Sequence, residues 1–319
     1  MLEVTRSAAR ASRGDAPGLG RRFANLWHEI TRRESRIGYL FLLPSLVILG
    51  VFVFWPIIQA FILSIQHWQF GNHPTTWVGL QNYQRVLTDN RAIGAFRNTL
   101  VYTVVTVPLG LLISLGLALA LNERLPGRNV LRSIFFLPVI GSFAVIAIVW
   151  SFLLNPDIGL LSYWLKSLGL GPTNWLRDFR YAMPAVIMVS IWKSVGFNMV
   201  IFLAGLQGIP EVLYEAAKVD GASRRQRLWY ITLPQLRPTF IFVLVIAVIG
   251  SFQVFDQVYV MTPGGGPLFS TETVVSYIYY QGVTATDISY AATIGVVLFA
   301  IVFVLTLIQL RVLRFRQLD

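Results

Sequence analysis

The sequence has no cysteine, and histidine occurs only three times in 319 residues. The absence of thiols excludes disulfides, thiolate metal sites and a cysteine nucleophile. His28, His67 and His73 are too scattered for the close ligand spacing of a typical zinc site. No G-x-x-x-x-G-K-[ST] phosphate loop is present, nor any Gly-Lys dipeptide. We therefore predict a chain that binds no metal or cofactor and is not a nucleotide-hydrolysing enzyme.

Charge is also scarce. Only 13% of the residues are charged and 55% are hydrophobic, with a mean hydropathy of +0.63. A soluble domain carries roughly 25% charged residues. The deficit indicates that lipid replaces water over much of the surface.

Six apolar runs are long enough to cross a bilayer, which takes about 20 residues. They comprise residues 37–65, 98–121, 131–154, 184–206, 239–260 and 290–310. The predicted fold class is therefore all-α, a polytopic membrane protein with six transmembrane helices.

The basic residues indicate the orientation of these helices. When residues at the ends of the runs are counted with the adjoining loops, 19 of the 26 Lys and Arg lie on the side of the termini and six on the other side. The positive-inside rule then places both termini in the cytoplasm. Residues 1–36 form a basic tail that fixes topology, or residues 21–36 form a basic helix on the membrane surface. No soluble segment is long enough for a basic nucleic-acid-binding domain, so we expect a lipid bilayer as a partner and no nucleic acid.

The inner loop of residues 207–238 is too long for a simple connector. Pro210 suits the first turn of a helix, so residues 211–219 are predicted to be helical. Gly221 breaks this helix, and a second helix follows over residues 222–230. From these features alone two interpretations stay open, a hairpin that docks a partner and an amphipathic hairpin that rests on the bilayer.

The spacing within this loop matches a known motif. Glu215-Ala216-Ala217, then Gly221, then Ile231-x-Leu233-Pro234 resemble the EAA motif, which marks the membrane subunits of bacterial ABC importers. In this prediction, Pro234 and Pro238 end the hairpin. Other segments are similar to the carbohydrate-uptake branch of these permeases: Asn98-Thr99, Phe135-Phe136-Leu137-Pro138, Gly205-Leu206, and Thr262 with Gly265-Gly266-Pro267. The chain lacks the extra spans and large periplasmic domain of the maltose system's larger permease. It is more similar to the six-span permeases of glycerol-phosphate, lactose and related oligosaccharide importers.

The resemblance implies a type I ABC importer permease fold in the bacterial inner membrane. It implies a second homologous permease, two ATPase subunits that hold ATP and Mg, and an extracytoplasmic solute-binding protein as partners. The implied solute is a sugar or a related polyol. The expected organisation is a tail of residues 1–36, a first helix and outer loop (37–97), a transmembrane core (98–310) and a tail (311–319). By this resemblance, the residues that couple to the ATPase are Glu215, Ala216, Ala217, Asp220, Gly221, Ala222, Ile231, Leu233 and Pro234.

Polar residues inside predicted spans are costly and therefore suggest function. Gln253, Asp256 and Gln257 are spaced to share one face of a helix. We predict that this face contacts solute, with further candidates in Lys193, Asn198, Ser251, Trp150 and Tyr259. The alternative is a structural role, either a pair of Lys193 with Asp256 or a hydrogen-bonded contact between helices. A stand-alone secondary transporter or channel, and a membrane scaffold, remain the competing classes.

Overall fold

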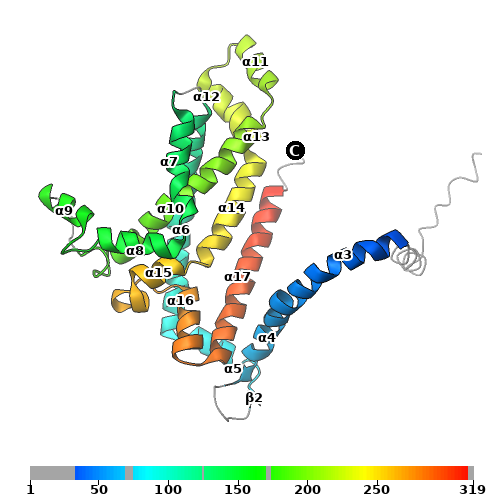
Figure 1. Ribbon diagram of the computed structural model, residues 1–319, viewed down its shortest axis with the longest axis vertical. Coiled ribbons are helices and arrows are strands. Elements are labelled where there is room, and N and C mark those ends of the chain that lie inside the picture. Colours follow the sequence, from blue (N-terminus) through cyan, green and yellow to red (C-terminus); the bar gives the residue numbers. More distant parts are fainter. Residues whose placement is uncertain (1–32, 69–74, 124–125, 170–173, 315–319) are drawn as a thin grey trace, which may run out of the picture. The chain divides into compact units, whose positions relative to one another are not determined.

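The computed structural model describes residues 33–68, 75–123, 126–169 and 174–314 (Figure 1). The chain divides into two compact units, residues 1–59 and 60–319. In the described part, four helices are long and apolar enough to span a membrane, and six spans result if two bent helix pairs each count as one. The predicted basic tail lies almost wholly outside the described residues.

The first unit is a run of apolar helix. It contains α3 (Arg33–Leu49), the π-helical turn η2 (Gly50–Phe54) and the start of α4 (Trp55–Ser64). None of the most apolar window of Gly38–Ser64 is buried within the chain. A helix that is apolar on all sides is stable only when lipid or protein surrounds it, so the predicted first span agrees with the structure.

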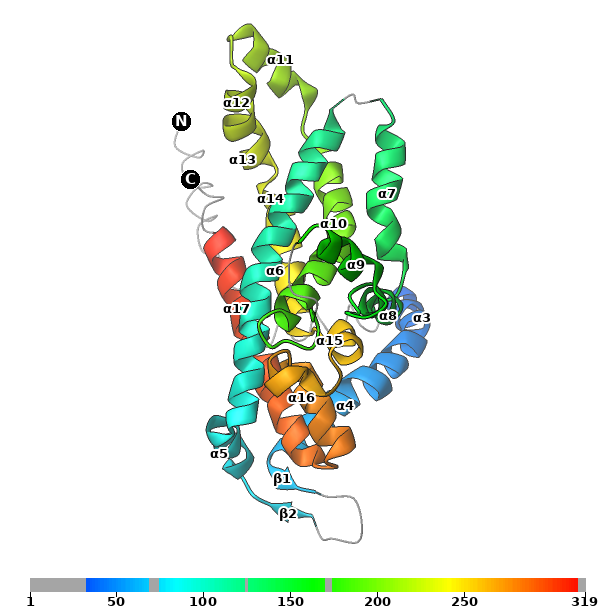
Figure 2. The same cartoon turned by 90° about the vertical axis from the view of Figure 1, so that its left-hand side faces the viewer.

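The second unit is a bundle of long helices. α6 (Asn90–Asn122), α10 (Ala182–Gln207), α14 (Arg237–Phe252) and α17 (Ile288–Arg314) lie side by side (Figures 1 and 2). α7 (Arg128–Ile140) packs against α10. Large side chains fully buried among these helices include Phe202, Met199, Val243 and Ile294.

Two predicted spans are broken rather than continuous. Residues 131–154 comprise α7 and α8 (Phe143–Leu153), which meet at 99° around Gly141 and Ser142. Ser142 is extended, and its hydroxyl accepts a hydrogen bond from the Val145 amide. An N-cap of this kind starts a new helix, so the helix axis changes direction at Ser142.

The second break interrupts residues 239–260. α14 ends at Phe252 and α15 (Asp256–Met261) begins after three non-helical residues. α15 then packs against α8, so the outer halves of the two broken spans meet.

Shorter elements complete the described part of the chain. Those outside the inner loop are β1 (Gln66–His67), antiparallel to β2 (Thr76–Trp77), α5 (Gln81–Thr88), α9 (Leu160–Ser167), η4 (Pro263–Gly265), η5 (Pro267–Phe269), α16 (Val274–Tyr279) and η6 (Tyr280–Thr284). The inner loop holds α11 (Glu211–Val219), α12 (Arg224–Arg227), η3 (Leu228–Thr232) and α13 (Leu233–Gln235).

A polar network ties the outer segments together. Asp89 caps α6 and accepts hydrogen bonds from the Arg91 amide (2.9 Å) and from the hydroxyls of Tyr277 (2.5 Å) and Tyr290 (2.8 Å). Burial raises the pKa of Asp89, but these hydrogen bonds outweigh burial and hold that pKa below its ordinary value. Burial and the adjacent carboxylate together raise the pKa of Tyr277 to about 12. The network fixes the start of α6 against α16 and α17.

Candidate solute cavity and inner loop

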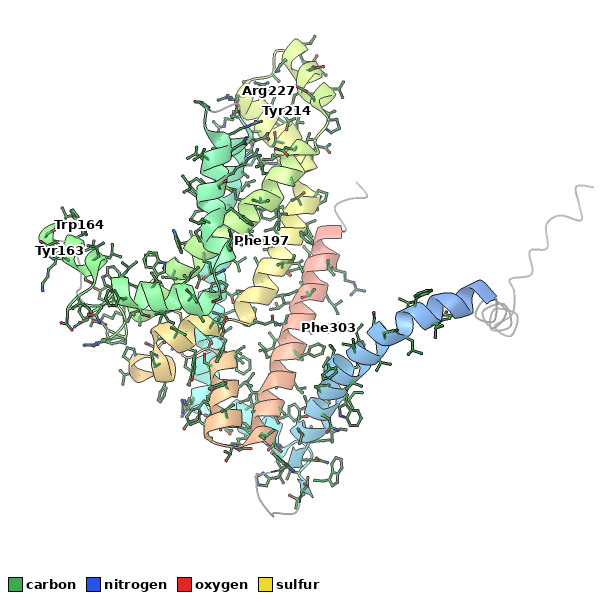
Figure 3. All side chains as sticks on the ribbon, in the orientation of Figure 1. Tyr163, Trp164, Phe197, Tyr214, Arg227 and Phe303 are labelled. Carbon is green, nitrogen blue, oxygen red and sulfur yellow. The ribbon has the colours of Figure 1, made fainter. Side chains whose placement is uncertain are left out.

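A cavity of about 300 Å3 with a mixed apolar and polar lining lies among α6, α10, α14, α15 and the start of α8. Its polar lining comes from Tyr102, Thr106, Ser190, Ser194, Asn198, Ser251, Gln253, Asp256 and Gln257. Phe197, which also lines it, lies midway along the bundle in Figure 3. Irregular backbone at membrane depth is tolerated where it lines a cavity, and both broken spans contribute residues here. The cavity therefore lies where the two spans are broken.

Five predicted solute-path residues line this cavity: Asn198, Ser251, Gln253, Asp256 and Gln257. The prediction that Gln253, Asp256 and Gln257 share one helix face is wrong. Gln253 and Asp256 do not share a helix face, because Gln253 follows the end of α14 and Asp256 starts α15. The turn between them still directs Gln253, Asp256 and Gln257 to the same cavity.

The cavity residues differ in their freedom to bind a ligand. Gln257 is buried and donates hydrogen bonds to the Tyr102 hydroxyl (3.1 Å) and the Ser190 hydroxyl (3.2 Å). The side chains of Asn198, Gln253 and Asp256 have no hydrogen-bond partner among the described residues. Asn198 is buried, and a buried amide needs a partner. Gln253 and Asp256 are exposed, so all three are available for the hydroxyl groups of a ligand.

Three other candidates lie outside the cavity lining. Lys193 does not pair with Asp256, so the predicted structural pair is wrong; the three ion pairs in the described chain join other residues. Trp150 packs edge-on against Trp192, with ring centroids 5.5 Å apart. Tyr259 stacks on Phe255 at 5.1 Å.

Sequence reasoning missed Tyr102, Ser190, Ser194 and Phe143 as lining residues. Ser190 and Ser194 stand four residues apart on α10, and Asn198 follows after four more. A polar stripe at helical spacing inside a span was the signal that identifies this face. Tyr102 and Phe143 carry no such signal, because other helices bring them to the cavity.

In the inner loop, the prediction of a helix over residues 211–219 is confirmed by α11. The turn after it explains the spacing of the motif. The Gly221 amide donates to the Lys218 carbonyl (3.1 Å) and the Ala222 amide to the Ala217 carbonyl (2.8 Å), while Gly221 has φ +74°. This is a Schellman motif with glycine at the left-handed position. Ala217 and Gly221 must therefore be four residues apart for the helix to end in this way.

The second helix of the loop is displaced from the prediction. It begins after Ser223, whose side chain and that of Gln226 form a capping box, and continues through η3 and α13. This helical stretch ends at Gln235, one residue after Pro234. Pro238 lies in the first turn of α14, after a bend of 62°, and so leads into the fifth span as predicted.

The loop has an exposed end and an anchored end. Glu215, Ala216, Asp220 and Gly221 are exposed, as are the apolar Val212 (64%) and Val219 (88%). Ala217, Ala222 and Leu233 are half-buried, Pro234 is exposed, and Ile231 packs against the core. The Tyr214 hydroxyl contacts the Thr232 hydroxyl at 3.0 Å, and Tyr214 lies near Arg227 in Figure 3. The motif thus combines an outward surface with residues that attach it to the bundle.

The fold and these features define a multi-pass membrane component of a transport system. The chain belongs to the family described as "binding-protein-dependent transport system inner membrane component", whose model matches residues 99–317. This confirms the resemblance drawn from the EAA spacing and the predicted class of ABC importer permease.

Several relatives are similar over nearly their whole length. The trehalose/maltose transport system permease protein MalF of Thermococcus litoralis is 37% identical, over 92% of this chain and 99% of that one. The sn-glycerol-3-phosphate transport system permease protein UgpA of Yersinia enterocolitica is 36% identical, over 87% and 94%.

Solved structures show the same fold. A chain of a bacterial ABC transporter involved in the import of the acidic polysaccharide alginate matches with a TM-score of 0.81 and 26% identity, over 91% of this chain and 98% of that one. The alginate transporter in complex with its alginate pentasaccharide-bound periplasmic protein matches with a TM-score of 0.78 and 26% identity, over 89% and 95%.

Proposed function

We propose that this chain imports a sugar or related polyol, delivered by an extracytoplasmic binding protein and driven by ATP hydrolysis on two partner ATPase subunits. A second permease completes the path, and both termini face the cytoplasm. The observation that carries the proposal is the cavity where two broken spans meet. Free amide and carboxylate groups, with Phe143 and Phe197 as apolar walls, suit the hydroxyls and apolar faces of a carbohydrate.

The relatives support the solute class. The relatives and the solved structure transport trehalose, maltose, glycerol phosphate and alginate, according to their names. These are polyhydroxylated solutes with different charges. The stand-alone transporter or channel receives no support, because the family is defined by dependence on a binding protein.

The inner loop fits the role of an ATPase contact. Val212 and Val219 leave exposed apolar area on α11 next to Glu215 and Ala216. Exposed apolar residues beside small and charged ones are typical of a protein contact. Gly221 turns the chain so that α11 ends at this surface.

The solute path is tested by Gln253→Ala in the importer assembled with its own partners. The solute is first identified by a thermal-shift screen of the cognate binding protein against sugars and polyol phosphates. We expect Gln253→Ala to lower uptake into proteoliposomes about tenfold with normal assembly, because one good hydrogen bond to a ligand contributes about 1.5 kcal/mol. The matched control is Gln84→Ala, which removes an exposed amide on α5. Equal uptake by both variants, or loss of assembly alone, contradicts this role for Gln253.

A further inference from the structure

Lys193 is a buried cation that does not line the cavity. It lies on α10 and is 8% exposed. Its Nζ is 3.5 Å from the Val139 carbonyl oxygen and 4.2 Å from the centroid of the Phe143 ring. Val139 is in the last turn of α7 and Phe143 is the first residue of α8. The ammonium group therefore bridges the two sides of the 99° break.

Each of these contacts stabilises the break. The last carbonyls of α7 have no partner within the helix, and a cation near a helix C-terminus is favourable. An aromatic face attracts a desolvated cation more strongly than an exposed one. Ser142 supplies the cap for the first turn of α8, so the break is held from both sides. In a continuous helix the Val139 carbonyl would accept a hydrogen bond from the Phe143 amide four residues on, so its contact with Lys193 favours the bent form.

The break also positions a wall of the cavity. Phe143 lines the cavity together with Asn198 and Gln253, whereas Lys193 does not line it. We propose that Lys193 is a positioning residue that holds the broken third span and so places the Phe143 ring against the solute. The inference rests on the proposed function for its consequence in transport, but its structural part is independent of it.

The structural part is tested with 4-fluorophenylalanine at position 143 in the full chain in lipid nanodiscs, followed by fluorine NMR. We compare the parent with Lys193→Met, which removes the charge at similar volume, and Lys193→Arg, which keeps it. The expected result is one sharp resonance in the parent and the Arg variant, and a shifted or broadened one in the Met variant. An unchanged resonance in Lys193→Met overturns the proposal.

The transport part is tested in the assembled importer with its cognate binding protein and the solute found for it. We expect Lys193→Met and Phe143→Leu each to lower the maximal uptake rate about fivefold with KM within twofold, and Lys193→Arg to recover most of the rate. Because both changes act through one contact, the double variant should be no slower than either single variant. Additive losses, or a Met variant with normal uptake, overturn the positioning role. If instead the proposed solute path is wrong, the Gln253→Ala variant will show normal uptake. If Lys193→Met does not assemble, Phe143→Leu alone decides, since normal uptake in that variant refutes the role of the ring.

Discussion

Replacement of Gly221 separates the conformation of the inner loop from its surface chemistry. The residue has φ +74°, and a Cβ built on it meets nothing within 4 Å in this chain. Side chains at this position therefore act on the backbone or on a partner, and not on packing within the chain. An L-residue in the left-handed region costs roughly 1–2 kcal/mol, and Asn and Asp are the residues best tolerated there.

The cost can be compared with what holds the turn. The two hydrogen bonds of the Schellman motif, from Gly221 and Ala222, contribute about 1 kcal/mol each. Gly221→Ala should thus cancel half or more of this stabilisation and lower the equilibrium constant for forming the turn about tenfold, since 1.4 kcal/mol is a factor of ten. Gly221→Asn should reduce it much less.

The assay is solute uptake and solute-stimulated ATP hydrolysis by the assembled importer, with the amount of chain in the membrane as the control. We expect uptake to fall several-fold in Gly221→Ala and to stay within about twofold in Gly221→Asn. Gly221→Asp has the same shape as Asn but adds a charge to the exposed end of α11, and it should abolish transport while the protein stays in the membrane. Normal uptake by the Asp variant refutes docking at this surface. An Ala variant as active as the parent refutes the conformational argument.

Two further changes test the scaffold around these sites. Gly196→Ala should lower the free energy of unfolding by roughly 1–3 kcal/mol, and with it the melting temperature, because the added Cβ overlaps the Phe135 carbonyl oxygen. In the control Gly116→Ala the added Cβ meets no atom within 4 Å, so the melting temperature should not fall. Asp89→Asn should destabilise the chain by roughly 1.5–3 kcal/mol at neutral pH, through its lost charge-assisted hydrogen bonds. The folded pKa of Asp89 lies below its ordinary value of 3.8, so the carboxylate stabilises the fold above about pH 4. That contribution is lost as the pH falls through the folded pKa, and the gap in melting temperature between parent and variant should shrink below pH 4.

The sequence predicted the spans but not their breaks. A hydropathy window adds apolar residues without regard to direction, so a span bent at Ser142 scores like a straight one. Residues 253–255 did not indicate the second break either, because neither proline nor glycine occurs there. The assumption of a continuous helix then produced the wrong face for Gln253 and the wrong partner for Lys193. Contacts between distant segments, such as Lys193 with Phe143, act together with the local Ser142 cap at the first break.

The inner loop was predicted more accurately because its signals are local. Helix α11 follows from Pro210 and ends at Val219, two residues before the left-handed Gly221, all within twelve residues of sequence. The second helix was misplaced because Ser223 and Gln226 were not recognised as a capping box, a signal that was also local. The two prolines were placed correctly, because Pro234 is one residue from the end of the second helix and Pro238 lies in the first turn of the next one.

One helix connects the two sites directly. α14 starts at the 62° bend that ends the inner loop and stops at Gln253, in the cavity wall. Its 16 residues span about 24 Å at 1.5 Å per residue. A helix resists compression along its axis, and Leu236 at its start and Phe252 at its end are both buried. If partner ATPase subunits displace the loop as proposed, α14 delivers that displacement to the break beside Gln253. The break is held by fewer bonds than a helix, because the Val254 carbonyl accepts from the Thr273 hydroxyl (2.9 Å) and not from a backbone amide of its own span. We therefore expect a displacement of the loop to act on the cavity at this point, where α14 ends.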